Sequence, residues 1–92
     1  MEGRKLILAD GTEYSEGEAG YSEGHLWLYL LPSTDFARAF ADFNDEEKTD
    51  HIAFVFGENR VEYEHFTDLR GIMRDADGQV TVHLARPNRE EG

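Results

Sequence analysis

The chain has 92 residues, with 20 Asp and Glu against nine Lys and Arg, and a formal net charge of -11. This charge argues against direct binding to DNA, RNA or anionic lipid, and the absence of cysteine excludes disulfides and cysteine-ligated zinc. No apolar run reaches the ~20 residues that span a bilayer, and residues 1–5 do not resemble a signal peptide. We therefore expect an intracellular, soluble protein that forms one domain over residues 1–92.

The first third of the chain predicts three strands. Residues 5–9 form the first strand, which ends at a turn at 10–11, and residues 12–14 form a short second strand. Residues 15–24 are polar and contain three glycines, so they predict either an acidic binding loop or a solvated hairpin connection. Residues 25–31 are apolar at nearly every position, which indicates a central strand that ends at Pro32.

A helix should follow, capped by Ser33 or Thr34 and ending near Asn44. Its core-facing stripe has helical spacing and consists of Phe36, Ala39, Phe40 and Phe43. Asp42 is expected on the polar side of this helix. Residues 44–50 form the densest acidic run, either as a loop or as one extra helical turn.

The remaining segments predict strands at 52–56, at 61–66 continuing through 69–74, and at 79–84, with a tight turn at 75–78. Gly71 within a strand suggests a bulge or bend. The fold class is α+β, with one twisted antiparallel sheet of about five to six strands packed against one helix in the order β-β-β-α-β-β-β. Residues 87–92 are expected to form a flexible tail.

No motif of catalysis or cofactor binding is present, so we expect neither an enzyme nor a bound cofactor. The turn at 75–78 resembles a calcium loop, but aligning its glycine with the sixth loop position places Met73 and Leu84 where oxygen ligands are needed. No two histidines share a short metal-ligand spacing, although His65 and His83 could meet across neighbouring strands. The sequence therefore predicts no metal site.

Carboxylates are concentrated in the first half of the chain, where residues 10–50 hold eleven acidic residues and only two basic ones, Arg38 and Lys48. Such a field attracts basic surfaces, and tyrosines among the carboxylates add contact area. The predicted partner-binding residues are Glu13, Glu16, Glu18, Glu23, Asp42, Asp45, Glu46, Glu47, Asp50, Tyr14 and Tyr21, with Tyr29 as a further candidate anchor. The alternative is that these groups are solvated and only prevent aggregation.

A strand-and-turn pattern runs through four segments: 5–12 (KLILADGT), 24–29 (GHLWLY), 63–67 (YEHFT) and 77–82 (DGQVTV). Together they resemble small proteins of bacteriophages and prophages of gut bacteria. The resemblance implies a cytoplasmic location in a bacterial host and one of two roles. One is a small virion-associated or tail-region protein, and the other is an inhibitor of host defence such as an anti-CRISPR protein, several of which resemble DNA in charge display.

We therefore predict a non-enzymatic, phage-encoded acidic protein that binds a basic, nucleic-acid-handling protein, such as a Cas nuclease, and blocks nucleic-acid access as a DNA mimic. The alternative is a small phage structural or tail-associated protein that acts through self-assembly. No functional position is carried over from the resemblance, and the oligomeric state is left open.

Overall fold

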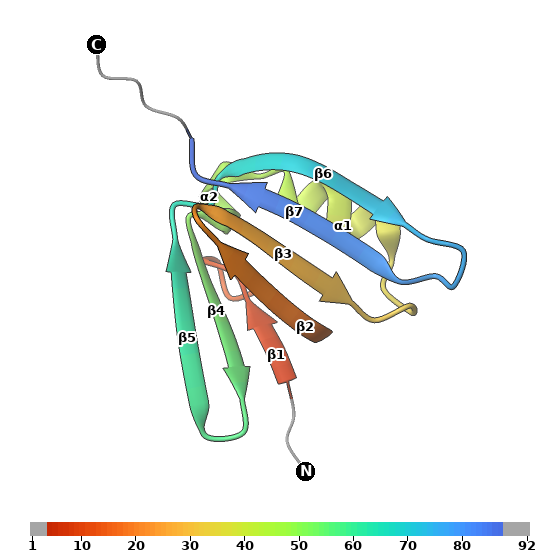
Figure 1. Ribbon diagram of the computed structural model, residues 1–92, viewed down its shortest axis with the longest axis horizontal. Coiled ribbons are helices and arrows are strands. Elements are labelled where there is room, and N and C mark those ends of the chain that lie inside the picture. Colours follow the sequence, from red (N-terminus) through yellow and green to blue (C-terminus); the bar gives the residue numbers. More distant parts are fainter. Residues whose placement is uncertain (1–3, 88–92) are drawn as a thin grey trace.

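The computed structural model describes residues 4–87, and of residues 16 and 17 only the backbone. Its elements in chain order are β1 (Arg4–Ile7), β2 (Glu13–Ser22), β3 (His25–Leu30), α1 (Phe36–Phe43), α2 (Glu46–Thr49), β4 (His51–Phe56), β5 (Asn59–Glu64), β6 (Asp68–Arg74) and β7 (Val80–Ala85). The strands pair antiparallel in the order β5-β4-β1-β2-β3-β7-β6, and α1 lies behind them in the view of Figure 1. The predicted α+β class is therefore confirmed.

Strand β2 takes part in two four-stranded antiparallel sheets, so the predicted single sheet of five to six strands with one helix is only partly correct. Its first residues pair with β1, where Ser15 lies opposite Lys5. The rest of β2 pairs with β3, where Ser22 lies opposite His25. One sheet is β5-β4-β1-β2 and the other is β2-β3-β7-β6, and in Figure 1 β4 and β5 run across the direction of β3 and β7.

The predicted loop at 15–24 is wrong, because most of this segment belongs to β2. Its polar composition does not prevent strand formation, since β1 and β3 both offer backbone partners. A register shift between Glu16 and Glu18 marks a bulge that exchanges the two faces of the strand, so Tyr14 before it and Ala19 after it both pack on the core. The true connection is the two-residue turn Glu23-Gly24, which has positive φ at both positions as a type I′ hairpin requires.

The core fills the space between the sheets and the helices. Alternate residues of β3 and β7 point inward and are fully buried, while their neighbours on the outer face are half-buried. One buried cluster unites both sheets and α1: Leu6, Leu8, Tyr14, Leu26, Leu28, Leu30, Ala39, Phe43, Ile52, Phe66, Val80, Val82 and Leu84. The predicted central position of the strand at 25–31 is confirmed, because β3 lies between β2 and β7.

Both helices are capped by aspartate. Asp35 caps α1 and Asp45 caps α2, and each side chain accepts a hydrogen bond from a backbone N–H of the first turn. The predicted cap at Ser33 or Thr34 is therefore wrong. An aspartate also complements the positive end of the helix dipole, which the hydroxyl of a serine or threonine does not.

The inward face of α1 is rotated from the predicted stripe. Ala39 and Phe43 are buried as expected, but Phe40 is 46% exposed. Asp42, expected on the polar side, is only 6% exposed. The face is rotated toward Asp42 because Tyr14 and Lys48 donate hydrogen bonds to its carboxylate. A pattern of apolar residues alone does not reveal these partners.

The predicted continuation of one strand through residues 61–74 is also wrong. Strands β5 and β6 lie at opposite ends of the strand order, yet only residues 65–67 join them, and Figure 1 shows the end of β5 close to the start of β6. Phe66 anchors this short connection because its side chain is fully buried in the core. The predicted irregularity at Gly71 is confirmed by a register shift between Leu69 and Gly71.

The tight turn predicted at 75–78 is present, and the Asp75 carboxylate accepts hydrogen bonds from the backbone N–H groups of Asp77 within it and of Gln79 directly after it. From residue 88 on, the predicted tail at 87–92 lies outside the described residues. Within residues 4–87, neither helix has the length or the apolar composition needed to cross a membrane.

A buried polar contact joins β2 to both helices. The Tyr14 hydroxyl donates to one oxygen of Asp42, and Lys48 Nζ donates to the other at 2.7 Å. Burial acts to raise the pKa of Asp42, but the hydrogen bonds from Lys48 and Tyr14 outweigh it and hold the pKa below its ordinary value. Burial and the Asp42 carboxylate raise the pKa of Tyr14. Asp42 is therefore an ionised, hydrogen-bonded carboxylate inside the fold.

Replacing Tyr14 by Phe should lower the free energy of unfolding at neutral pH by about 1–3 kcal/mol, because a buried carboxylate loses a hydrogen bond. Urea unfolding measures this loss. The stabilisation belongs to ionised Asp42, so it is present above the ordinary pKa of 3.8 and lost as the pH falls through the lower pKa of the folded state. The difference between the two proteins should therefore shrink in acid.

Tyr29→Phe is the matched control. Tyr29 is half-buried, and its hydroxyl makes no hydrogen bond to any group that the structure describes, so this change should cost less than about 0.5 kcal/mol. Equal losses in the two variants would contradict the role assigned to the Tyr14 hydroxyl.

Candidate interaction site

Three of the predicted carboxylates meet at one end of the molecule. Glu46 and Glu47 occupy the first turn of α2, Asp50 follows its last turn, and together with Thr67 they line an open groove. Asp45 supports this arrangement, because its carboxylate accepts a hydrogen bond from the Glu47 N–H at 3.0 Å and so fixes the start of α2. The side chains of Glu46, Glu47 and Asp50 are exposed.

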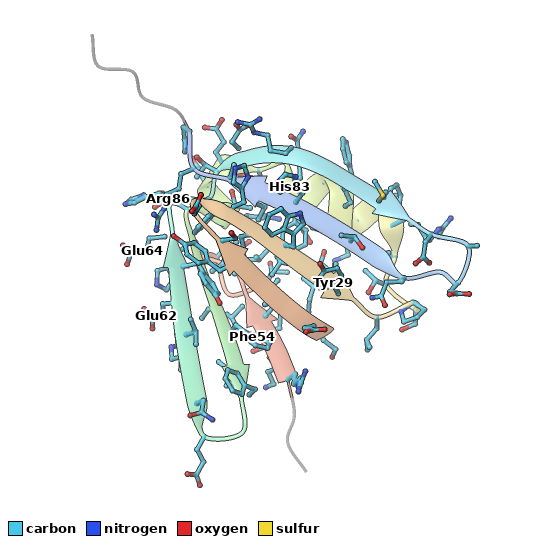
Figure 2. The ribbon with its side chains drawn as sticks, viewed as in Figure 1. Tyr29, Phe54, Glu62, Glu64, His83 and Arg86 are labelled. Atoms are coloured by element: carbon cyan, nitrogen blue, oxygen red, sulfur yellow. The ribbon has the colours of Figure 1, made fainter. Side chains whose placement is uncertain are left out.

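A second hollow of about 470 Å³ adjoins this groove and shares two of its residues; it is lined by Asp50, His65, Thr67, Arg86 and Pro87. The His65 backbone N–H donates to the Asp50 carbonyl at 2.8 Å, and His65 Nδ1 lies 3.1 Å from Asp50 Oδ1. Arg86 Nε donates to the Glu64 carbonyl at 3.2 Å, and Figure 2 shows these two residues close together where β5 and β7 end.

Glu23 reaches the same end through the turn between β2 and β3. The Arg86 N–H donates to the carbonyl of Gly24 at 3.2 Å, which brings this turn beside the second hollow. Within residues 4–87, Glu23 and His65 are the two non-glycine residues with positive φ, at 44° and 70°. The positive φ of Glu23 belongs to the type I′ turn, whereas that of His65 is a strained conformation of the kind that gathers at binding sites. We call Glu23, Glu46, Glu47 and Asp50 the acidic end.

Other predicted carboxylates lie elsewhere. Glu13 Oε1 is 3.6 Å from Lys5 Nζ, and Glu13 lines a separate groove between β2 and the start of α1. Glu18 is exposed on the outer face of β2, opposite Tyr29. The side chain of Glu16 lies outside the described residues. The predicted acidic residues therefore do not form one continuous surface.

The two predicted tyrosine anchors differ in their surroundings. Tyr14 is buried with Asp42, so neither side chain is open to a partner. Tyr21 is 50% exposed and lies edge-on to Phe66, with ring centroids 5.8 Å apart. The Arg86 guanidinium lies 4.7 Å from the centroid of the same Phe66 ring. Tyr21 therefore sits beside the acidic end, close to Arg86.

Basic residues pair with carboxylates outside the acidic end, and Arg86, which lines a hollow with Asp50, donates to the Glu64 carbonyl. Ion pairs join Lys5 to Glu13, Lys48 to Asp42, Arg60 to Glu62 and Arg70 to Asp68. In the described part of the chain, no lysine or arginine pairs with Glu23, Glu46, Glu47 or Asp50. The acidic end therefore keeps its negative charge.

An aromatic surface on the outer face of β3 and β7 was not predicted. His25 Nδ1 lies 3.0 Å from His83 Nε2, and the Trp27 ring stacks on that of His83 with centroids 4.8 Å apart. His65 does not meet His83: His65 contacts Asp50, and His83 contacts His25. The alternation of His25 and Trp27 is visible in the sequence, and so is the strand that becomes β7, but the pairing of β3 with β7 is not.

Glycines leave this aromatic surface open on both sides. Gly20 pairs with Trp27 and Gly71 with His83, so bare backbone flanks the two rings. Burial lowers the pKa of His83, and the nearby positive charges of His25 and Arg70 lower it further.

No family model, no curated protein and no solved structure matches this chain. The inference of function therefore rests on the surface of the chain itself.

The lowered pKa of His83 predicts a loss of stability in mild acid. Below the ordinary histidine pKa of 6.5 the unfolded chain takes up a proton that folded His83 does not, so unfolding becomes easier as the pH falls toward the folded-state pKa. Denaturant unfolding from about pH 7.5 to about pH 5.5 should show this loss, and His83→Gln should reduce it.

His65→Gln is the control for this experiment, because His65 is an exposed histidine away from the Trp27 surface. This variant should lose stability in mild acid as the unaltered protein does. A loss that depends on His65 and not on His83 would disprove the assignment.

Proposed function

We propose that this chain is a non-enzymatic interaction protein that binds a basic protein surface through its acidic end. The observation that carries the proposal is that Glu46, Glu47 and Asp50 line one open groove and that no lysine or arginine of residues 4–87 pairs with them. A lysine or arginine side chain of a partner supplies the missing positive charge. The net charge of -11 steers basic partners toward the protein over longer distances.

Tyr21 supports this function as an anchor beside the charges. Charge pairs at the rim of an interface contribute mainly to association rate and specificity, whereas buried aromatic side chains contribute most of the affinity. Half of Tyr21 is exposed, and its other contacts hold the ring in place against Phe66. A partner that covers this ring while engaging Glu46 and Glu47 gains both kinds of contact.

In its finer form, the proposal is that the partner is a nucleic-acid-handling protein of a bacterial host, such as a Cas nuclease. The chain would then be a phage-encoded inhibitor that occupies a basic groove in place of DNA or RNA. Carboxylates on α2 and on the neighbouring turn present several negative charges within one surface, as successive phosphates do.

The alternative of a phage structural protein that self-assembles through a sheet edge has less support. Both edge strands carry charged side chains: Arg60, Glu62 and Glu64 on β5, and Asp68, Arg70 and Arg74 on β6. Charged side chains on an edge strand oppose its pairing with another sheet.

Reversing the charge of both Glu46 and Glu47 to Lys should weaken binding of a fluorescent peptide of alternating lysine and arginine by about tenfold or more at low salt. Fluorescence anisotropy gives the Kd. Affinity of the unaltered protein should fall steeply as salt rises, because ions screen exposed charges over about 8–10 Å at 0.1–0.15 M.

The matched control reverses Glu58 and Asp77, two exposed acidic residues in the β4–β5 and β6–β7 turns. It changes net charge equally and should weaken binding much less. Equal weakening by both pairs would mean that total charge, and not the acidic end, attracts the peptide. Affinity independent of salt would also contradict the proposal.

The finer proposal is tested with the immobilised chain in a bacterial lysate. Proteins retained by the unaltered chain but not by the Glu46→Lys, Glu47→Lys variant should elute with rising salt and should be released by added double-stranded DNA. Captured proteins that DNA does not displace would exclude mimicry of nucleic acid while leaving the basic-partner function standing.

A further inference from the structure

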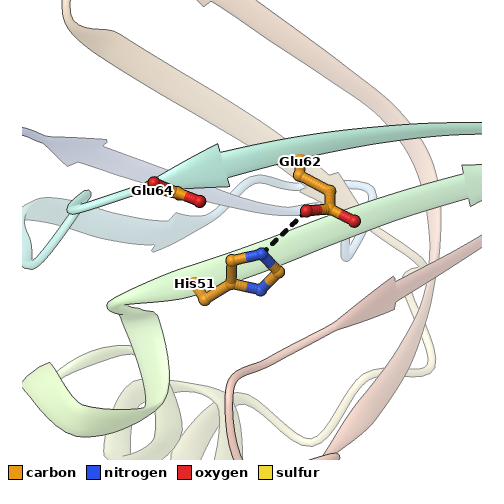
Figure 3. A group of neighbouring side chains, drawn as sticks. All are labelled: His51, Glu62 and Glu64. Atoms are coloured by element: carbon orange, nitrogen blue, oxygen red, sulfur yellow. Dashed lines mark hydrogen bonds and ion pairs between the residues drawn. The ribbon is translucent and has the colours of Figure 1, made fainter.

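A histidine and two glutamates gather on the outer face of the β4–β5 pair. His51 begins β4 and lies directly opposite Glu64 of β5, while Glu62 lies opposite Ala53. Residues 62 and 64 point to the same side of β5, because alternate residues of a strand share a face. The small side chain of Ala53 leaves room for the Glu62 carboxylate to lean toward His51. Figure 3 shows the three side chains converging from the two strands.

The ligand atoms of these residues are close to one another. His51 Nε2 lies 3.0 Å from Glu62 Oε1, and one nitrogen of His51 and one oxygen each of Glu62 and Glu64 all fall within 4.8 Å of one another. A tetrahedral ion with bonds of about 2.1 Å holds its ligand atoms about 3.4 Å apart. Two of the ligand atoms here would therefore have to approach each other by about 1.4 Å at most. Rotation of the exposed Glu64 side chain supplies such a movement.

The charges at this place are incompletely compensated. Arg60 Nε donates to Glu62 Oε2 at 2.7 Å, which leaves Oε1 facing His51. Within residues 4–87, the Glu64 carboxylate has no hydrogen bond and no ion pair. Two carboxylates that converge on one point repel each other, and a divalent cation between them removes that repulsion.

The donor set points to the kind of cation. Calcium and magnesium prefer all-oxygen sites, whereas an imidazole nitrogen with two carboxylate oxygens suits zinc and related first-row metals. We infer that His51, Glu62 and Glu64 form a Zn²⁺ site on the exposed face of β4 and β5. Three protein ligands leave a fourth position for water or for a group of another molecule. The inference does not rest on the proposed partner binding, although Asp50 of the acidic end directly precedes His51 in the chain.

Isothermal titration of ZnCl₂ into the untagged full chain tests the site. One Zn²⁺ should bind per chain, and binding should weaken by about tenfold or more in His51→Ala and in Glu64→Gln, since each removes a ligand. Both residues are half-buried or exposed, so circular dichroism should show that the variants fold. Co²⁺ should bind with a visible absorption spectrum of nitrogen and oxygen ligation, whereas Mg²⁺ should bind far more weakly.

The matched control changes a second histidine–carboxylate contact, His65 with Asp50, which has the same chemistry but no third ligand among the described residues. His65→Ala and Asp50→Asn should leave zinc affinity unchanged. The inference is overturned if zinc does not bind, if His51→Ala and Glu64→Gln bind it as tightly as the unaltered chain, or if the His65 variant loses binding equally. None of these results depends on peptide binding, so a negative result for zinc does not contradict the proposed partner binding at the acidic end.

Discussion

Backbone pairing on both sides of β2 is the constraint on which the rest of the structure depends. β2 forms backbone hydrogen bonds with β1 over its first residues and with β3 over the rest, and so joins two sheets that would otherwise each have a second open edge beside β5 or β6. The bulge between Glu16 and Glu18 shifts the alternation by one residue. Without that shift, one of the two sheets would turn its apolar face toward water, because a slip of one position exchanges the faces of a strand.

Tyr14 of β2 links the sheet to the two helices. Its hydroxyl binds Asp42 of α1, and Asp42 draws Lys48 of α2 inward. Because the one lysine of α2 is turned toward the interior, the outward side of that helix presents Glu46 and Glu47 without a compensating base. The interaction that fixes the helices on the sheet therefore also creates the negative surface on which the proposed function rests.

Strong local patterns were readable in the sequence, whereas features that depend on distant partners were not. Strand β3, helix α1 and the turn at 75–78 follow from apolar periodicity and turn residues. The burial of Asp42 depends on Tyr14, 28 positions away, and periodicity contains no such information. At the candidate site, the grouping of Glu46 and Glu47 follows from their spacing. The approach of His51 to Glu62, in contrast, follows only from the register of β4 on β5.

The stacking of Trp27 on His83 has an optical consequence. The chain contains a single tryptophan, whose ring lies 4.8 Å from that of His83 at an interplanar angle of 12°. A protonated imidazole accepts an electron from an excited indole far more readily than a neutral one, and so dims its emission. The native protein thus carries an intrinsic fluorescent reporter of its outer sheet face, and a molecule that alters the stacking or the protonation of His83 should change its brightness without an added label.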